Sequence, residues 1–71
     1  METILTKREI EIVILIGQGL KNYQIAEKLY ISLGTVKTHI TSIFEKLEIS
    51  YRVQAPLKAL ALGIIKIDEV V

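Results

Sequence analysis

The chain contains no cysteine and no tryptophan, and it has only one histidine, one proline and four glycines. The absence of cysteine excludes disulfides, thiol nucleophiles and thiolate metal sites, so packing alone must hold the fold together. A single histidine without a matching cluster of ligands makes neither a metal site nor a catalytic site. We therefore expect no metal ion and no cofactor.

Long apolar runs are also missing. The longest, residues 12–16 and 59–65, are far shorter than the ~20 residues that a membrane span requires. The N-terminal segment lacks the features of a secretory signal, so we expect a cytoplasmic protein without a membrane span. Hydrophobic residues nevertheless make up 51% of the chain, which is too many for a disordered tail and predicts a folded domain.

Length and charge limit the possible functions. The 71 residues allow one small domain, which we expect to span residues 1–71 with a core at about 5–65. Residues 21–58 contain six Lys or Arg and three Glu, a local charge of +3 within a net charge of +1. This excess fits a phosphate-facing surface and a solvated helical face equally well. We find no paired carboxylates and no glycine-rich phosphate loop, and we do not expect an enzyme or a small-molecule substrate.

Capping residues and apolar spacing predict four helices, at about 7–18, 22–30, 33–48 and 52–62. Thr6 and Glu9 form a capping box at the start of the first helix, and Gly19 follows its end. Asn22 and Ser32 are the candidate N-caps of the second and third helices. The chain is therefore predicted to be all-α.

The third helix has the clearest amphipathic pattern. Its apolar residues recur at helical intervals along one face: Val36, Ile40, Ile43, Phe44 and Leu47. Its opposite face carries polar side chains: Lys37, Thr38, Thr41 and Glu45. A short helix, a turn and a longer amphipathic helix form the helix-turn-helix pattern, whose second helix enters the major groove of DNA. Generic helical hairpins share this pattern, so spacing alone leaves DNA binding and core packing both open.

Several separated motifs resemble those of the LuxR-type DNA-binding domain, which is also called GerE-type. They are LTKRE at 5–9, GLKN at 19–22, QIA at 24–26, IS at 31–32, TVKTH at 35–39, KL at 46–47 and RVQA at 52–55. Their order and spacing match over about residues 5–65. The resemblance implies a four-helix domain of the LuxR C-terminal type, in which helices two and three form the helix-turn-helix and the fourth is commonly the dimer contact.

The resemblance also assigns DNA contacts on the third helix. Lys37, Thr38 and Thr41 lie where the family's recognition helix contacts bases or neighbouring phosphates. Lysine can donate to O6 and N7 of guanine, and threonine can offer its hydroxyl to a base edge or its methyl group to thymine. His39 lies at the edge of the apolar face, and we expect it to pack or to contact a phosphate.

Four further residues are candidates for phosphate binding. Asn22 and Thr35 lie near helix N-termini, where backbone amides and short polar side chains meet phosphate. Lys46 and Arg52 are expected to clamp backbone phosphates, which would raise the affinity for all DNA sequences alike.

Three positions depart from the family pattern. Gly34 stands where many members carry a basic residue, and residues 33–37 also resemble region 4 of the small extracytoplasmic-type sigma factors. Lys21 replaces the usual capping Ser or Thr. Pro56 replaces an aliphatic residue and lacks a backbone N–H, so we expect the first turn of the last helix to be distorted or to begin near Ala55.

Two apolar pairs occupy positions that are usually polar in the family: Ile10 with Ile14, and Leu57 with Ala61. The members of each pair are four residues apart and share one side of a helix. We expect Leu57 and Ala61 to lie in a homodimer interface, and Ile10 and Ile14 to contact the same partner or another protein. Looser packing within the monomer is the alternative.

The sequence therefore predicts a transcriptional regulator that binds double-stranded DNA sequence-specifically, as a dimer at a paired half-site. It would contact or block RNA polymerase, either as a stand-alone regulator or as the output domain of a response regulator. One alternative is a protein-interaction helix-turn-helix module that binds a partner regulator, which the low net charge, Gly34 and Glu45 support. The other is a sigma-factor region 4-like module, which would require core polymerase.

Overall fold

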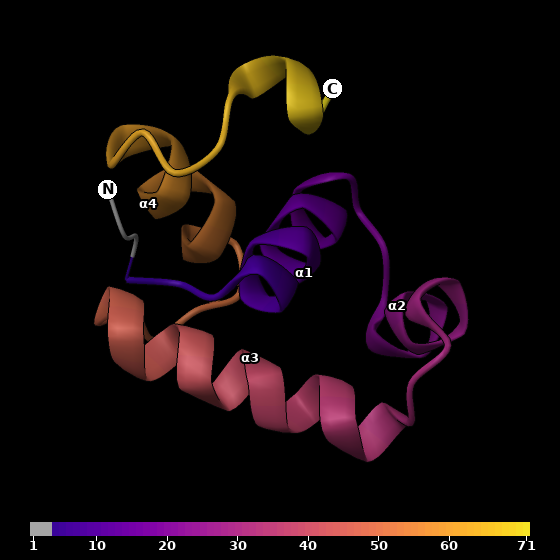
Figure 1. The fold of residues 1–71 in the computed structure, drawn as a ribbon. Helices are drawn as coiled ribbons and strands as arrows, with labels where there is room; N and C mark the ends of the chain where they lie inside the picture. The colour runs from indigo at the N-terminus through magenta and orange to yellow at the C-terminus, as the bar shows by residue number, and fades with distance from the viewer. Residues whose placement is uncertain (1–3) are drawn as a thin grey trace.

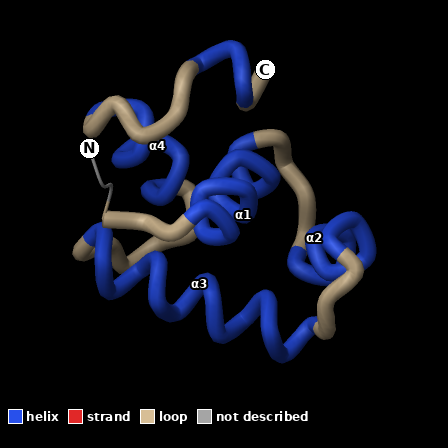
Figure 2. The backbone as a smooth tube through the Cα atoms, viewed as in Figure 1, coloured by secondary structure: helices blue, strands red, loops and turns tan. Residues whose placement is uncertain are grey.

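In a computed structural model, which describes residues 4–71, the chain folds into helices joined by short loops (Figures 1 and 2). The elements are α1 (Lys7–Gly17), α2 (Asn22–Leu29), α3 (Leu33–Leu47), α4 (Gln54–Ala61) and a short 3₁₀ helix, η1 (Ile67–Glu69). Figure 1 shows α3 along one edge of the molecule, with α1, α2 and α4 on the same side of it. The all-α prediction is confirmed. Residues 1–3 of the predicted domain lie outside the described residues.

The core lies where the apolar faces of the helices meet. Its fully buried side chains come from all four helices: Ile12, Val13, Ile25, Val36, Ile43, Ala55 and Ala59. The predicted apolar face of α3 is confirmed for Val36, Ile43 and Leu47, which are buried, and for Ile40, which packs against the core. Phe44, the fifth predicted residue, is half-buried. Between residues 4 and 71, no helix is both long enough and apolar enough to cross a membrane.

Local hydrogen bonds set the helix starts. The predicted capping box is present: the Glu9 N–H donates to Thr6 Oγ1 at 3.2 Å, and the Thr6 N–H donates to Glu9 Oε1 at 2.8 Å. The predicted N-cap of α2 is wrong, since Asn22 is the first helical residue and Lys21 occupies the N-cap position. The Lys21 N–H donates to the side-chain oxygen of Gln24 at 2.8 Å. This bond satisfies the Lys21 N–H, and no side chain at the N-cap position bonds to the first turn of α2.

The start of α4 follows from Pro56. The helix begins at Gln54, two residues later than the apolar pattern suggested and close to the start expected from the proline. Pro56 is the third helical residue, where a backbone N–H has no partner within the helix, so the missing donor costs little. The carbonyl of Arg52, four residues before the proline, accepts a hydrogen bond from the Ala55 N–H at 3.1 Å instead.

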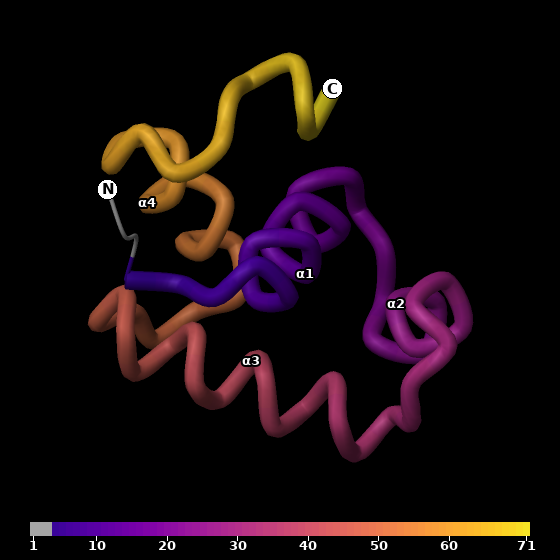
Figure 3. Tube along the Cα trace, viewed as in Figure 1, coloured from indigo at the N-terminus to yellow at the C-terminus, as the bar shows by residue number. Residues whose placement is uncertain are grey.

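The last residues of the chain, 64–71, fold back over the C-terminal end of α1 (Figure 3). Ile65 is buried, and Val70 packs so close to Gly17 that a Cβ atom there would lie 2.5 Å from Val70 Cγ1. The Gln18 Nε2 group donates to the carbonyl oxygen of Glu69 at 2.8 Å. The sequence predicted no element in this segment.

Candidate nucleic-acid interface

The polar face of α3 points away from the other helices. We define the α3 outer face as the five residues Gly34, Lys37, Thr38, Thr41 and Glu45, all of which are exposed. Figure 1 shows the other helices together on one side of α3, so that the opposite side of α3 is free of helices. The structure therefore brings the three predicted base-contacting residues together on one continuous surface.

The two threonines of this face have the same side-chain geometry. Thr38 Oγ1 donates to the Gly34 carbonyl oxygen and Thr41 Oγ1 donates to the Lys37 carbonyl oxygen, each at 3.0 Å. This bond to the carbonyl four residues back is a common arrangement for threonine in a helix. It engages the hydroxyl proton and leaves the oxygen lone pairs and the methyl group at the surface.

The N-terminus of α3 is held by Ser32. Ser32 Oγ accepts a hydrogen bond from the Thr35 N–H at 3.0 Å, as predicted, and lies 2.8 Å from Thr35 Oγ1. Thr35 is exposed in the first turn, where the helix dipole is positive. This position suits a phosphate, and the contact stays a prediction.

Asn22 and Arg52, which the sequence assigned separately to phosphates, contact each other. Arg52 Nη1 donates to Asn22 Oδ1, and Arg52 Nη2 donates to the Leu20 carbonyl oxygen at 2.9 Å. Burial lowers the pKa of Arg52, although an arginine remains charged at neutral pH. The guanidinium group thus ties the loop before α4 to the N-terminus of α2. Phosphate binding by either residue stays a prediction.

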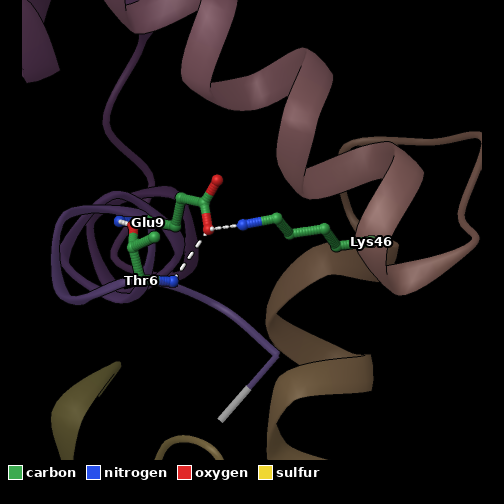
Figure 4. A network of polar contacts seen from close by, with 3 residues as sticks. All are labelled: Thr6, Glu9 and Lys46. Carbon is green, nitrogen blue, oxygen red and sulfur yellow. Dashed lines mark hydrogen bonds and ion pairs between the residues drawn. The ribbon is translucent and has the colours of Figure 1, made fainter. Parts of the chain in front are cut away.

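Lys46 lies on the side of α3 that faces α1, where it forms an ion pair with Glu9 (Figure 4). Its Nζ atom is 2.8 Å from Glu9 Oε1. Burial alone would raise the pKa of Glu9, but hydrogen bonds from Lys46, Thr6 and Ser42, together with the Lys46 charge, outweigh burial and lower the pKa to about 2. The predicted phosphate contact of Lys46 stays untested, and its ammonium group has a partner inside the chain.

A hollow of about 470 Å³ opens beside the N-termini of α2 and α3. Basic and apolar side chains line it together: Lys21, Lys37 and Arg52 with Leu20, Tyr23 and Leu33. Three of the six cations in the local charge excess therefore meet at one rim of the α3 outer face. These cations are up to 31 positions apart in the sequence (52 − 21), and no spacing rule connects them.

A family model described as "Bacterial regulatory proteins, luxR family" matches residues 3–59. The chain belongs to the luxR family of bacterial regulatory proteins. The luxR-family domain is 54% identical over 55 residues to the transcriptional regulatory protein LiaR of Bacillus subtilis (strain 168), covering 78% of this chain and 26% of LiaR. It is 48% identical over 60 residues to the transcriptional regulatory protein LnrK of the same strain, and these residues cover 84% of this chain and 27% of LnrK.

The response regulator protein VraR of Staphylococcus aureus (strain NCTC 8325 / PS 47) is 46% identical over 56 residues, which cover 79% of this chain and 27% of VraR. The match thus spans about a quarter of the length of these relatives. The family description and the names of these relatives describe regulators and not enzymes. They confirm the LuxR-type prediction and favour it over the sigma-factor alternative.

The luxR-family domain keeps an apolar side of α4 exposed. Leu57 is 60% exposed, Ala61 is exposed, and Val53 lies four residues before Leu57 with a similar exposure. Ile10 and Ile14 are only half-buried and pack against the core. Their predicted contact with a partner stays untested, as does the dimer interface.

Proposed function

We propose that this domain binds double-stranded DNA by inserting the α3 outer face into the major groove and that it regulates transcription in this way. The observation that carries the proposal is the exposure of Lys37, Thr38 and Thr41 on one face of a helix whose opposite face is buried. With 15 residues, α3 is about 22 Å long at ~1.5 Å per residue, and a major groove about 12 Å wide admits a helix.

Phosphate contacts are proposed around this face. Thr35 lies at the positive end of the α3 dipole, and Asn22 lies in the first turn of α2. Arg52 and Lys46 keep donors beyond those used within the chain, because a guanidinium group has five N–H donors and an ammonium group has three. Their hydrogen bonds within the chain would hold both cations in place before DNA binds.

We also propose that two copies associate through α4, with Leu57 and Ala61 at the contact. Two recognition helices one DNA turn apart, about 34 Å, would then match a paired half-site. The domain would act in the cytoplasm and contact or block RNA polymerase. The same DNA-binding role serves a stand-alone regulator and the output domain of a response regulator.

The test is fluorescence anisotropy of the purified chain with a pool of random duplexes at several salt concentrations, followed by selection of the bound fraction. Each neutralised phosphate should contribute a slope of about −0.9 to the plot of log affinity against log salt. Lys37→Ala should weaken binding to the selected duplex by about 1–3 kcal/mol and relax the sequence preference of the protein. Lys66→Ala, in the segment that packs over α1, is the matched control and should change nothing.

A folded chain that binds no duplex at low salt would contradict the proposal. That outcome would favour the protein-partner alternative. A second hollow, of about 230 Å³, supports this alternative, since Ile14, Leu15 and Leu29 give it apolar walls.

A further inference from the structure

We propose that Thr38 and Thr41 recognise the 5-methyl groups of thymines, so that the half-site carries T·A pairs opposite both threonines. This inference rests on the proposed function, because it assumes that the α3 outer face lies in the major groove. It assigns to two residues a base preference that their residue type alone leaves open.

The hydroxyl groups of both threonines already donate within the helix. A threonine hydroxyl has one proton, and in both side chains that proton is donated to a backbone carbonyl at 3.0 Å. Neither hydroxyl can then donate to a base without giving up its bond within the helix. What remains for DNA is a methyl group and an oxygen that accepts.

Small residues allow DNA to approach this part of α3 closely. Gly34, one turn before Thr38, has no side chain, and only Ser32 Oγ lies near the position that a Cβ atom would take, at 3.9 Å. Thr38 and Thr41 are three residues apart, so their side chains are neighbours on the surface of the helix. Because Gly34, Thr38 and Thr41 are small, this side of α3 can lie deep enough in the major groove for the threonine methyl groups to touch thymine methyl groups.

The polar groups of the α3 outer face match particular base edges. In the major groove guanine presents two acceptors, N7 and O6, and cytosine and adenine each present an amino donor, but only a T·A pair presents a methyl group. On the α3 outer face the donor is Lys37, and the threonine oxygens and the Glu45 carboxylate accept. The G·C pair is therefore expected opposite Lys37, and the methyl-bearing pairs opposite the threonines.

The experiment uses the duplex selected by the wild-type chain. Each thymidine of the half-site is replaced in turn by deoxyuridine, which removes only the methyl group, and the Kd is measured by anisotropy at fixed salt. Substitution at each of the two contacted positions should weaken binding about threefold to fivefold, as expected when the burial of one methyl group is lost. The remaining positions should change little.

Protein variants assign the contact. Thr38→Ser and Thr41→Ser retain the hydroxyl and lose the methyl group, so each should abolish the deoxyuridine effect at one position and leave it at the other. Thr38→Val retains the methyl group and should keep the effect. Lys37→Ala, the control, should weaken binding and keep both effects.

Two outcomes overturn the inference alone. One is sequence-selective binding that no deoxyuridine substitution alters, and the other is a deoxyuridine effect that survives in both serine variants. Absence of salt-dependent duplex binding by the wild-type chain would overturn the proposed function together with the inference. The threonines are exposed, and circular dichroism verifies that each variant folds.

Discussion

At the scale of single residues, Gly17 is the glycine at which an added side chain would have least room. A Cβ atom there would lie 2.5 Å from Val70 Cγ1, 3.1 Å from Val70 Cβ and 3.2 Å from Pro56 Cβ. We expect Gly17→Ala to displace residues 66–71 and to lower the free energy of unfolding by about 1 kcal/mol, despite the better helix propensity of alanine. Urea unfolding followed by circular dichroism measures the change.

Gly34 provides the matched control for this prediction. It is also helical, but Ser32 Oγ at 3.9 Å is the nearest atom to its would-be Cβ. Gly34→Ala should therefore leave stability unchanged or raise it by up to about 1 kcal/mol. Combining Gly17→Ala with Val70→Ala should remove most of the penalty. Equal losses from both glycine substitutions would contradict the close contact.

Among the hydrogen bonds of single residues, those that close within a few positions were predictable from the sequence. The Thr6–Glu9 capping box and the Ser32 cap were predicted correctly because each bond closes within three residues. The N-cap role predicted for Asn22 is wrong, and its bond to Arg52 was not predicted. Its partner Arg52 is 30 positions away, and a bond over that distance depends on how the helices pack.

At the scale of elements, the Glu9–Lys46 pair joins α1 to α3 and makes stability depend on pH. The pKa of Glu9 in the folded chain is about 2, below its ordinary value of 4.5. The stabilisation is therefore full above about pH 4.5 and is lost as the pH falls towards 2. Glu9→Gln should lower the free energy of unfolding by on the order of 2–3 kcal/mol at pH 7 and by little near pH 2.

Glu11 is the control for this prediction. Its carboxylate pairs with Arg8 at 3.1 Å, but both side chains are exposed. Glu11→Gln should change stability by less than about 0.5 kcal/mol at either pH. Chemical unfolding at a series of pH values compares the two variants. A loss for Glu9→Gln that persisted unchanged at pH 2 would rule out ionisation as its cause.

Element boundaries were largely predictable for the same reason as caps. The apolar pattern and caps predicted α1, α2 and α3 to within one residue at each end. Pro56 predicted the late start of α4 because a missing N–H acts locally. The packing of residues 64–71 on α1 was not predicted, since it depends on the close contact of Val70 with Gly17 and not on a local sequence pattern.

At the scale of the whole molecule, the apolar side of α4 carries the proposed dimer contact. We expect Leu57→Glu to lower the sedimentation mass to that of a monomer and to weaken DNA binding, because a buried carboxylate without a partner opposes association. Ile67→Glu is the control, since Ile67 in η1 is 61% exposed against 60% for Leu57. An unchanged mass and DNA affinity for folded Leu57→Glu would make the dimer assignment wrong.

The bond between Gln18 and Glu69 spans 51 positions, whereas the helix caps close within three or four. Closing a longer loop costs more chain entropy, so this bond should form after the helix ends during folding. Residues 66–69 and 71 are exposed, and the amides of this segment should exchange with solvent before those of α1 and α3. A pull on the C-terminus would therefore detach this segment first and leave the helix-turn-helix folded.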